Sequence, residues 1–276
     1  VVIADNCATF ANSIFNDYAQ FSGSTLVLGA LFFTFQIYCD FSGYSDIALG
    51  TARLFGIDLL RNFAFPYFSR DIAEFWRRWH ISLSSWFRDY LYIPLGGSKG
   101  GTWMKVRNTF IIFLVSGFWH GANWTFIVWG FLNALYIMPS IIFNTNRNNL
   151  EIVAKGKYLP TFKEVISIGI TFMLTVFAWI FFRANNVEHA FKYISIIFSK
   201  SLFTIPNFWE IHDTIPIIFL TILFLIIEWL GREEQYAIAK FGSGWFKPVR
   251  WAFYYGVILV IFYFAGSKQQ FIYFQF

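Results

Sequence analysis

Long apolar runs alternate with short polar segments along the whole chain. Three runs in the second half cover residues 165 to 182, 214 to 227 and 251 to 266, and an earlier one covers residues 25 to 39. The later runs approach the roughly 20 residues that a helix needs to cross a hydrocarbon core about 30 Å thick. The pattern therefore predicts an all-α protein whose helices cross a bilayer several times.

The earliest run is followed by a polar, glycine-containing stretch, DFSGYSD, at residues 40 to 46. The run itself is short for a full crossing. Irregular backbone at membrane depth is tolerated only where protein or a water-filled cavity satisfies its polar groups. Two interpretations remain open for residues 40 to 46, a re-entrant element and a surface loop.

Residues 71 to 90 show a helical period. Asp71 followed by Glu74 resembles a capping box. The apolar side that follows consists of Ile72, Phe75, Trp76, Trp79, Leu83, Trp86 and Tyr90, and the polar side of Arg77, Arg78, Ser85, Arg88 and Asp89. This spacing predicts one interfacial helix with His80 on the margin between its faces, ended by the turn-forming sequence PLGGSKGG at 94 to 101.

Residues 108 to 146 contain no Asp, Glu, Lys or Arg. As a single helix this stretch would be about 58 Å long, almost two bilayer cores, so it must cross twice, tilt steeply or run partly in the membrane plane. The strongest interruption within it is Gly121-Ala-Asn123, directly after Trp119 and His120. A helix interruption inside a membrane usually lines a cavity.

His120 is the first candidate for chemistry because an ionisable side chain at membrane depth is costly and needs a partner. A histidine with a pKa near neutrality can take a proton from a hydroxyl and return one to a leaving group, as acyl transfer requires. The structural alternative is a core histidine bonded to a carbonyl, to Ser116 or to Asn123. His189 and His212 lie in hydrophilic segments and are expected to be solvated.

Composition supports a membrane protein, since 57% of the residues are hydrophobic and 13% are charged, about half the usual share. Between positions 41 and 107 lie nine of the 21 Lys and Arg residues, which favours the cytoplasmic side for that segment. The formal charge of +5 is explained by loops that face anionic lipid, so no nucleic-acid partner is expected. Cys7 and Cys39 have no metal or redox spacing and are expected to be small buried residues.

The sequence offers no nucleophile elbow, phosphate-binding loop, dinucleotide fingerprint or zinc-ligand spacing, so no metal site and no bound cofactor are predicted. Four stretches instead resemble the membrane-bound O-acyltransferase family, and within it the branch of the alginate O-acetyltransferase membrane subunit. They are FQIYCDFSGYSDIALG (35 to 50), FWRRWHISLSSWFRDYLYIPLGG (75 to 97, preceded by Asn62), SGFWHGANWTFIVWG (116 to 130) and the terminal FIYFQF.

The resemblance implies a polytopic integral membrane protein with transmembrane, re-entrant and interfacial helices around a tunnel. It implies that His120 is the principal catalytic histidine and that His80 is a second one nearer the cytoplasmic mouth. The expected substrate-binding residues are Arg77, Arg78, Arg88, Trp119, Asn123 and Tyr273. Tyr273 enters as a possible acyl relay, because the tail resembles the acyl-accepting motif of the small partner in D-alanylation systems; an interfacial anchor is the alternative.

By the same resemblance, the donor is a cytoplasmic thioester, usually acetyl-CoA, and the acceptor is a hydroxyl of an extracytoplasmic polysaccharide, often reached through a partner acetyltransferase in the envelope. The expected location is the bacterial cytoplasmic (inner) membrane. Family members have further spans before the first motif, and residue 1 is Val, so residues 1 to 276 are expected to form a single membrane domain, the C-terminal part of a longer protein.

Three other functions share some of these sequence features. D-alanyl transfer to teichoic acid shares the helix and histidine motifs, although YIPLGGSKGG favours the acetyltransferase branch. A transporter or flippase with His120 as a proton relay is disfavoured because the later spans are expected to lack embedded carboxylates and no paired broken helices are evident. A scaffold that only docks an extracytoplasmic acetyltransferase, with inactive histidines, is the third.

Overall fold

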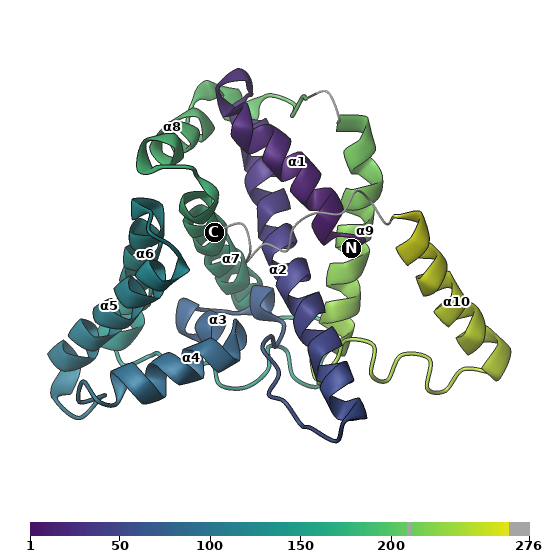
Figure 1. The fold of residues 1–276 in the computed structure, drawn as a ribbon, viewed down its shortest axis with the longest axis horizontal. Helices are drawn as coiled ribbons and strands as arrows, with labels where there is room; N and C mark the ends of the chain where they lie inside the picture. The colour runs from purple at the N-terminus through teal and green to yellow at the C-terminus, as the bar shows by residue number, and fades with distance from the viewer. Residues whose placement is uncertain (209–210, 265–276) are drawn as a thin grey trace. The chain divides into compact units, whose positions relative to one another are not determined.

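The computed structural model describes residues 1–208 and 211–264, and within those ranges every regular element is helical (Figure 1). The chain divides into two compact units. One consists of residues 1–44 together with the chain from Tyr193 onward, and the other of residues 45–192. The all-α prediction is confirmed for the described residues.

Within the described residues, four helices are long and apolar enough to cross a membrane. They are α2 (Gly23–Leu54), α6 (Trp124–Ile142), α7 (Phe162–Arg183) and His212–Gly231 within α9 (Ile211–Gly231). The spans predicted at 165 to 182 and 214 to 227 lie within α7 and α9. A helix also forms in the third predicted span, α10 (Lys247–Tyr263), and its crossing stays a prediction.

Helix α2 contradicts both interpretations of residues 40 to 46. It runs for 32 residues without interruption, through the whole polar stretch. A helix satisfies its own backbone hydrogen-bonding groups at any depth in the membrane. A glycine in its interior lowers helix stability by only about 1 kcal/mol. Gly43 is therefore insufficient to break a helix of this length.

The unit that contains the N-terminus joins α1 (Ala4–Asn16) and α2 to α9 by buried contacts. The Tyr38 hydroxyl donates to Glu228 Oε1 over 2.5 Å, and Cys7 is fully buried. Glu228 is 6% exposed and lies inside a spanning helix. The expectation that the later spans lack embedded carboxylates was wrong, because the apolar run ended one residue before Glu228.

The other unit begins with the last turns of α2, followed by short helices and then longer ones. Its elements are η2 (Pro66–Phe68), α3 (Ile72–Arg78), α4 (Ile81–Phe87), the π-helix η3 (Arg88–Tyr92), α5 (Gly101–His120), α6, α7 and most of α8 (Val187–Ile197). The interruption predicted at residues 121 to 123 is confirmed: it separates α5 from α6, and Asn123 caps α6 by accepting from the Thr125 amide over 3.1 Å.

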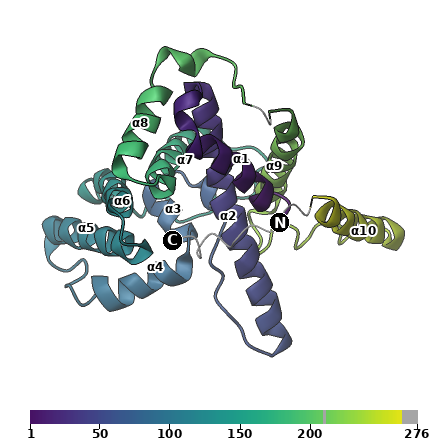
Figure 2. The same cartoon turned by 45° about the horizontal axis from the view of Figure 1, so that its top comes forward.

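Helices α5 and α6 lie side by side in both ribbon views (Figures 1 and 2). Two glycines permit their close approach. A Cβ at Gly117 would lie 2.3 Å from the Phe126 carbonyl oxygen, and one at Gly130 would lie 2.2 Å from the Phe113 carbonyl oxygen. Small residues are how helices in membranes bring their backbones together.

Gly130→Ala is therefore expected to push α5 and α6 apart and to destabilise the protein by about 1–3 kcal/mol. The obstructing atom is backbone and cannot rotate away. The check is the thermal unfolding temperature in detergent. Gly256→Ala in α10 is the matched control, since a Cβ there meets nothing within 4 Å; equal unfolding temperatures for the two variants would contradict the close-packing account.

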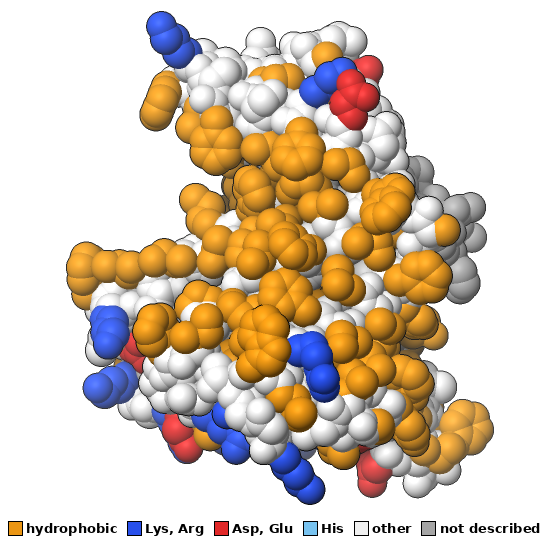
Figure 3. Space-filling model, turned by 90° about the vertical axis from the view of Figure 1, so that its left-hand side faces the viewer, with side chains coloured by type: hydrophobic (Ala, Val, Ile, Leu, Met, Phe, Trp, Pro, Cys, Tyr) orange, Lys and Arg blue, Asp and Glu red, His pale blue; other side chains and the backbone are white. Residues whose placement is uncertain are grey.

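The surface exposes many large apolar side chains, as is typical of a membrane protein. Figure 3 shows a broad zone of hydrophobic side chains on one face, with Lys and Arg side chains gathered mainly below it and also above it. In α7, for example, Ile170 and Met173 are 57% and 68% exposed. Side chains of this kind are stable at a surface that faces lipid rather than water.

Candidate active site

Two histidines lie at two helix interruptions in the unit formed by residues 45–192. His120 is the last residue of α5, and His80 separates α3 from α4. His80 has φ 42° and ψ 59°, a left-handed conformation that is uncommon outside glycine. The single helix predicted for residues 71 to 90 was therefore wrong, because the chain turns at His80.

The turn at His80 is stabilised by a segment that precedes the helices. The Ala64 amide donates to Arg78 O over 2.9 Å, and the Ile81 amide donates to Asn62 O over 3.0 Å. The Asn62 side-chain oxygen also accepts from the Ser82 hydroxyl over 2.6 Å and from the Ser82 amide over 3.2 Å. These bonds replace those that a continuous helix would make, so tertiary contacts override the helical pattern.

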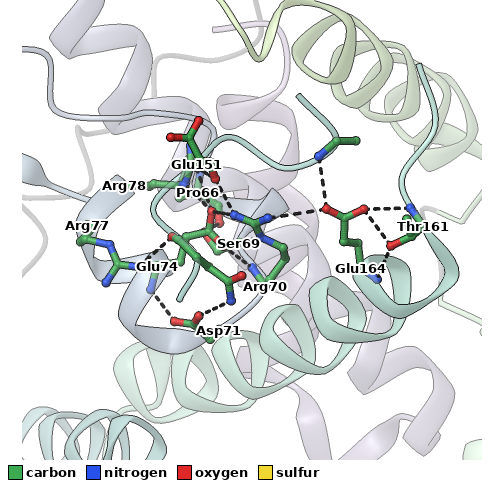
Figure 4. A network of polar contacts seen from close by, with 12 residues as sticks. Pro66, Ser69, Arg70, Asp71, Glu74, Arg77, Arg78, Glu151, Thr161 and Glu164 are labelled. Atoms are coloured by element: carbon green, nitrogen blue, oxygen red, sulfur yellow. Dashed lines mark hydrogen bonds and ion pairs between the residues drawn. The ribbon is translucent and has the colours of Figure 1, made fainter. Parts of the chain in front are cut away.

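Helix α3 begins as the sequence predicted, with the Glu74 amide donating to Asp71 Oδ1 over 2.6 Å. The other half of the expected capping box differs, because the Glu74 carboxylate accepts from the amide of Arg70 rather than from that of Asp71. Glu74 is 1% exposed and forms ion pairs with Arg70 at 3.0 Å and Arg78 at 2.8 Å (Figure 4). Arg78 also donates to Ala64 O.

A cavity of about 340 Å³ lies between α3, α4 and α5. Three of the predicted site residues line it: His80, Arg77 and Arg88. Arg147 and Asn146, which the sequence analysis missed, add a further cation and an amide from the polar segment after α6. The cavity is thus a partly apolar space into which three arginines and one histidine face.

The remaining predicted site residues do not line this cavity. Arg78 is bound to Glu74, and Trp119 is 54% exposed. The Asn123 side chain caps α6 and donates to Asn185 O over 2.8 Å. Tyr273 and the whole terminal FIYFQF lie outside the described residues.

Burial sets the charge state of the groups in the cavity. It lowers the pKa of His80 from its ordinary 6.5 to about 4, so the imidazole is neutral at physiological pH. Burial also lowers the pKa of Arg77, with Asp71 and Glu74 acting in the opposite direction. Arg77 donates to the carbonyls of Asn146 at 2.8 Å and Asn149 at 3.0 Å, which ties the polar segment to α3.

The lowered pKa of His80 predicts a pH-dependent stability. Between pH 6.5 and about 4 the unfolded chain binds a proton at His80 that the folded chain does not, so the contribution of neutral His80 is present above pH 6.5 and is lost as the pH falls towards 4. Unfolding temperatures of wild type and His80→Asn, measured from pH 7 to 4, are expected to converge as the pH falls. If the unfolding temperatures of the two proteins change in parallel with pH, the lowered pKa of His80 is contradicted.

His120 is surrounded by aromatic rings from three helices. Its ring centroid lies 5.0 Å from that of Trp119, 5.2 Å from Trp129 and 5.1 Å from Phe182. Trp129 and Phe182 are each 2% exposed. Neither ring could be predicted from the sequence, because they come from α6 and α7 and only the tertiary fold brings them to His120.

Helix α5 extends from His120 to the cavity that His80 lines. Ser116, one helical turn before His120, lines the cavity that holds His80. Of the other histidines, His212 is exposed as expected, but His189 is only 7% exposed. The expectation of a solvated His189 was wrong: His189 lies in the first turn of α8, and its amide donates to the side-chain oxygen of Asn186, the residue before that helix.

The chain thus combines helices able to cross a membrane with two histidines at helix interruptions and an arginine-lined cavity. The model of the membrane-bound O-acyltransferase (MBOAT) family matches residues 3–177, and the chain belongs to this family.

Similar proteins come from several branches of the family. The chain is 38% identical to the protein named Probable alginate O-acetylase AlgI of Pseudomonas aeruginosa, over 86% of this chain and 43% of that protein. It is 34% identical to the peptidoglycan O-acetyltransferase of Helicobacter pylori, over 100% of this chain and 54% of that protein. It is 31% identical to the teichoic acid D-alanyltransferase of Bacillus subtilis, over 59% of this chain and 43% of that protein. The chain spans about half the length of these relatives.

Proposed function

We propose that this chain belongs to an O-acyltransferase of the bacterial inner membrane that moves an acetyl group from a cytoplasmic thioester, acetyl-CoA, towards hydroxyl groups of an extracytoplasmic polysaccharide. The observation that carries the proposal is the pair of histidines at two helix interruptions of one unit, with an arginine-lined cavity beside one of them. The relatives named for acetyl transfer to alginate and peptidoglycan support the acyl group and the kind of acceptor.

His120 is assigned the role of general base. Its neutral imidazole takes the proton from the attacking hydroxyl as that oxygen bonds to the thioester carbonyl carbon. The carbon–sulfur bond then breaks, and the same imidazole returns the proton to the departing thiolate. The aromatic rings around His120 keep water away from the reacting atoms, which limits hydrolysis of the donor.

The cavity at His80 is assigned to the donor. Arg77, Arg88 and Arg147 line it, and guanidinium groups form strong charge-assisted bonds with phosphates such as those of coenzyme A. Arg78 drops out of the donor site in this proposal because its side chain does not line the cavity and is bound to the buried Glu74. Trp119 and Asn123 stay proposals as substrate contacts next to His120, and an extracytoplasmic acetyltransferase stays a proposed partner.

Arg88→Gln is expected to raise the KM for acetyl-CoA about tenfold and to leave kcat nearly unchanged, since a phosphate contact is made equally in the ground state and the transition state. The measurement is transfer of labelled acetyl groups in inverted membrane vesicles that contain the whole protein. Arg53→Gln is the matched control. Arg53 forms an ion pair with Asp58, as Arg88 does with Asp89, but Arg53 lies outside the cavity. An unchanged KM would remove Arg88 from the donor site.

D-alanyl transfer is the second candidate, favoured by the similarity to the teichoic acid D-alanyltransferase. The same vesicles distinguish the two when a D-alanyl carrier protein replaces acetyl-CoA. A transporter remains as an outcome of the test, since Glu228 removes one argument against it. Proton-coupled flux with no acylated product from either donor would overturn the proposed function.

A further inference from the structure

Two depressions occur side by side along the first turns of α7, apart from the histidines. The first is a polar pocket of about 500 Å³. The cations that line it are Arg70, Lys155, Lys157 and Lys163, and the single anion is Glu164. The second is a groove of about 660 Å³ between α6 and α7, lined by Tyr136, Ile166, Gly169, Ile170, Met173 and Phe177.

The two depressions share one helix. Lys163 and Ser167 line the basic pocket, whereas Ile166 and Ile170 line the apolar groove, so the border between them falls within two turns of α7. A side chain at Gly169 would meet nothing within 4 Å, so this glycine leaves the groove open. A basic pocket and an apolar groove lined by neighbouring residues of one helix together match the polarity of an amphiphile with an anionic head.

The carboxylates near the pocket are already engaged. Glu164 accepts from the Thr161 amide and hydroxyl and lies 3.6 Å from Arg70, as Figure 4 shows. Glu151 lies at the margin and pairs with Lys155 at 2.7 Å. Arg70 is itself paired with Glu74 at 3.0 Å. When Glu74 and Glu151 are counted with Glu164, four cations stand against three carboxylates, and the remaining positive charge favours a negatively charged ligand.

The surroundings place this pocket at the level of lipid headgroups. It lies at the first turn of a spanning helix, α7. The apolar residues beside it are strongly exposed: Tyr158 by 86%, Leu159 by 78% and Phe162 by 81%. Exposed aromatic and apolar side chains next to lysines are typical of the membrane interface, where anionic lipids attract basic segments.

We infer that this surface binds one anionic phospholipid of the bilayer. Lys155, Lys157 and Lys163 hold its phosphate, and one acyl chain lies in the groove between α6 and α7. The site is separate from the cavity at His80 and does not depend on the proposed acyl transfer.

Native mass spectrometry of the whole protein tests the inference after exchange into detergent with defined amounts of phosphatidylglycerol or phosphatidylcholine. Wild type is expected to retain phosphatidylglycerol at least tenfold more strongly than phosphatidylcholine. The variant Lys155→Gln/Lys157→Gln/Lys163→Gln is expected to lose that preference about tenfold or more. The control Lys192→Gln/Lys200→Gln/Lys240→Gln removes three exposed lysines elsewhere and is expected to keep it.

A second variant separates a lipid from a free anion. Gly169→Leu fills the groove and leaves the lysines in place, so it is expected to weaken phosphatidylglycerol binding several-fold. Inorganic phosphate at millimolar concentration is expected to compete poorly. The inference is overturned if the first triple variant retains phosphatidylglycerol like the control, or if phosphate competes fully and Gly169→Leu has no effect, which would indicate a free-anion site.

Discussion

His120→Ala is expected to abolish acyl transfer, with a fall in kcat of at least 10³-fold, while the protein still inserts and accumulates. The reason is that no other group described at the α5–α6 interruption can act as the base, and general base catalysis contributes about 10²–10⁴-fold. The measurement is the amount of labelled acetyl group in the envelope polymer, normalised to protein in the membrane. Ring packing against Trp129 and Phe182 makes His120→Gln a useful second variant, because it keeps part of the side-chain volume.

His212→Ala is the control for that experiment, since His212 is exposed at the start of α9. It is expected to keep full activity. Retained transfer in both His120 variants would remove His120 from the chemistry. Lost transfer with an intact complex of the protein and its envelope partner would instead argue against a scaffold with inactive histidines.

Glu74→Gln is expected to have the largest effect on stability. Glu74 is buried between Arg70 and Arg78, whose side chains are only 12% and 14% exposed. Removing one charge from a buried network leaves the others without compensation and costs about 3–5 kcal/mol. For a chain of this size that corresponds to a fall of roughly 6–20 °C in the unfolding temperature.

The exposed pair of Glu151 and Lys155 provides the comparison. Its side chains are 74% and 62% exposed, so Glu151→Gln is expected to cost less than about 1 kcal/mol. Thermal unfolding of both variants in the same detergent measures the difference. If Glu74→Gln unfolds within two degrees of Glu151→Gln, the buried network does not stabilise this unit.

Local signals in the sequence were sufficient for part of the fold. The interruption at residues 121 to 123 is encoded by a glycine followed by Asn123, which caps the next helix with its own side chain. The start of α3 at Asp71 is encoded in the same way. Both predictions were confirmed because the stabilising group lies within a few residues of the backbone that it satisfies.

Other features depend on segments far apart in the chain, so the sequence pattern could not predict them. The break at His80 needs the backbone and side chain of Asn62, and the rings around His120 come from α6 and α7. The pattern also failed to place Glu228 inside a span, because the predicted span was defined by apolar residues and therefore stopped at residue 227. The Tyr38 hydroxyl that makes this carboxylate tolerable lies 190 positions away.

The left-handed backbone of His80 gives this residue two separable duties. Its imidazole faces a cavity, while its main chain redirects the polypeptide between two short helices. Alanine adopts such a conformation reluctantly, glycine freely and asparagine with moderate ease. An alanine scan at this position therefore mixes the loss of a ring with a strained turn. Glycine and asparagine together would report on the ring alone.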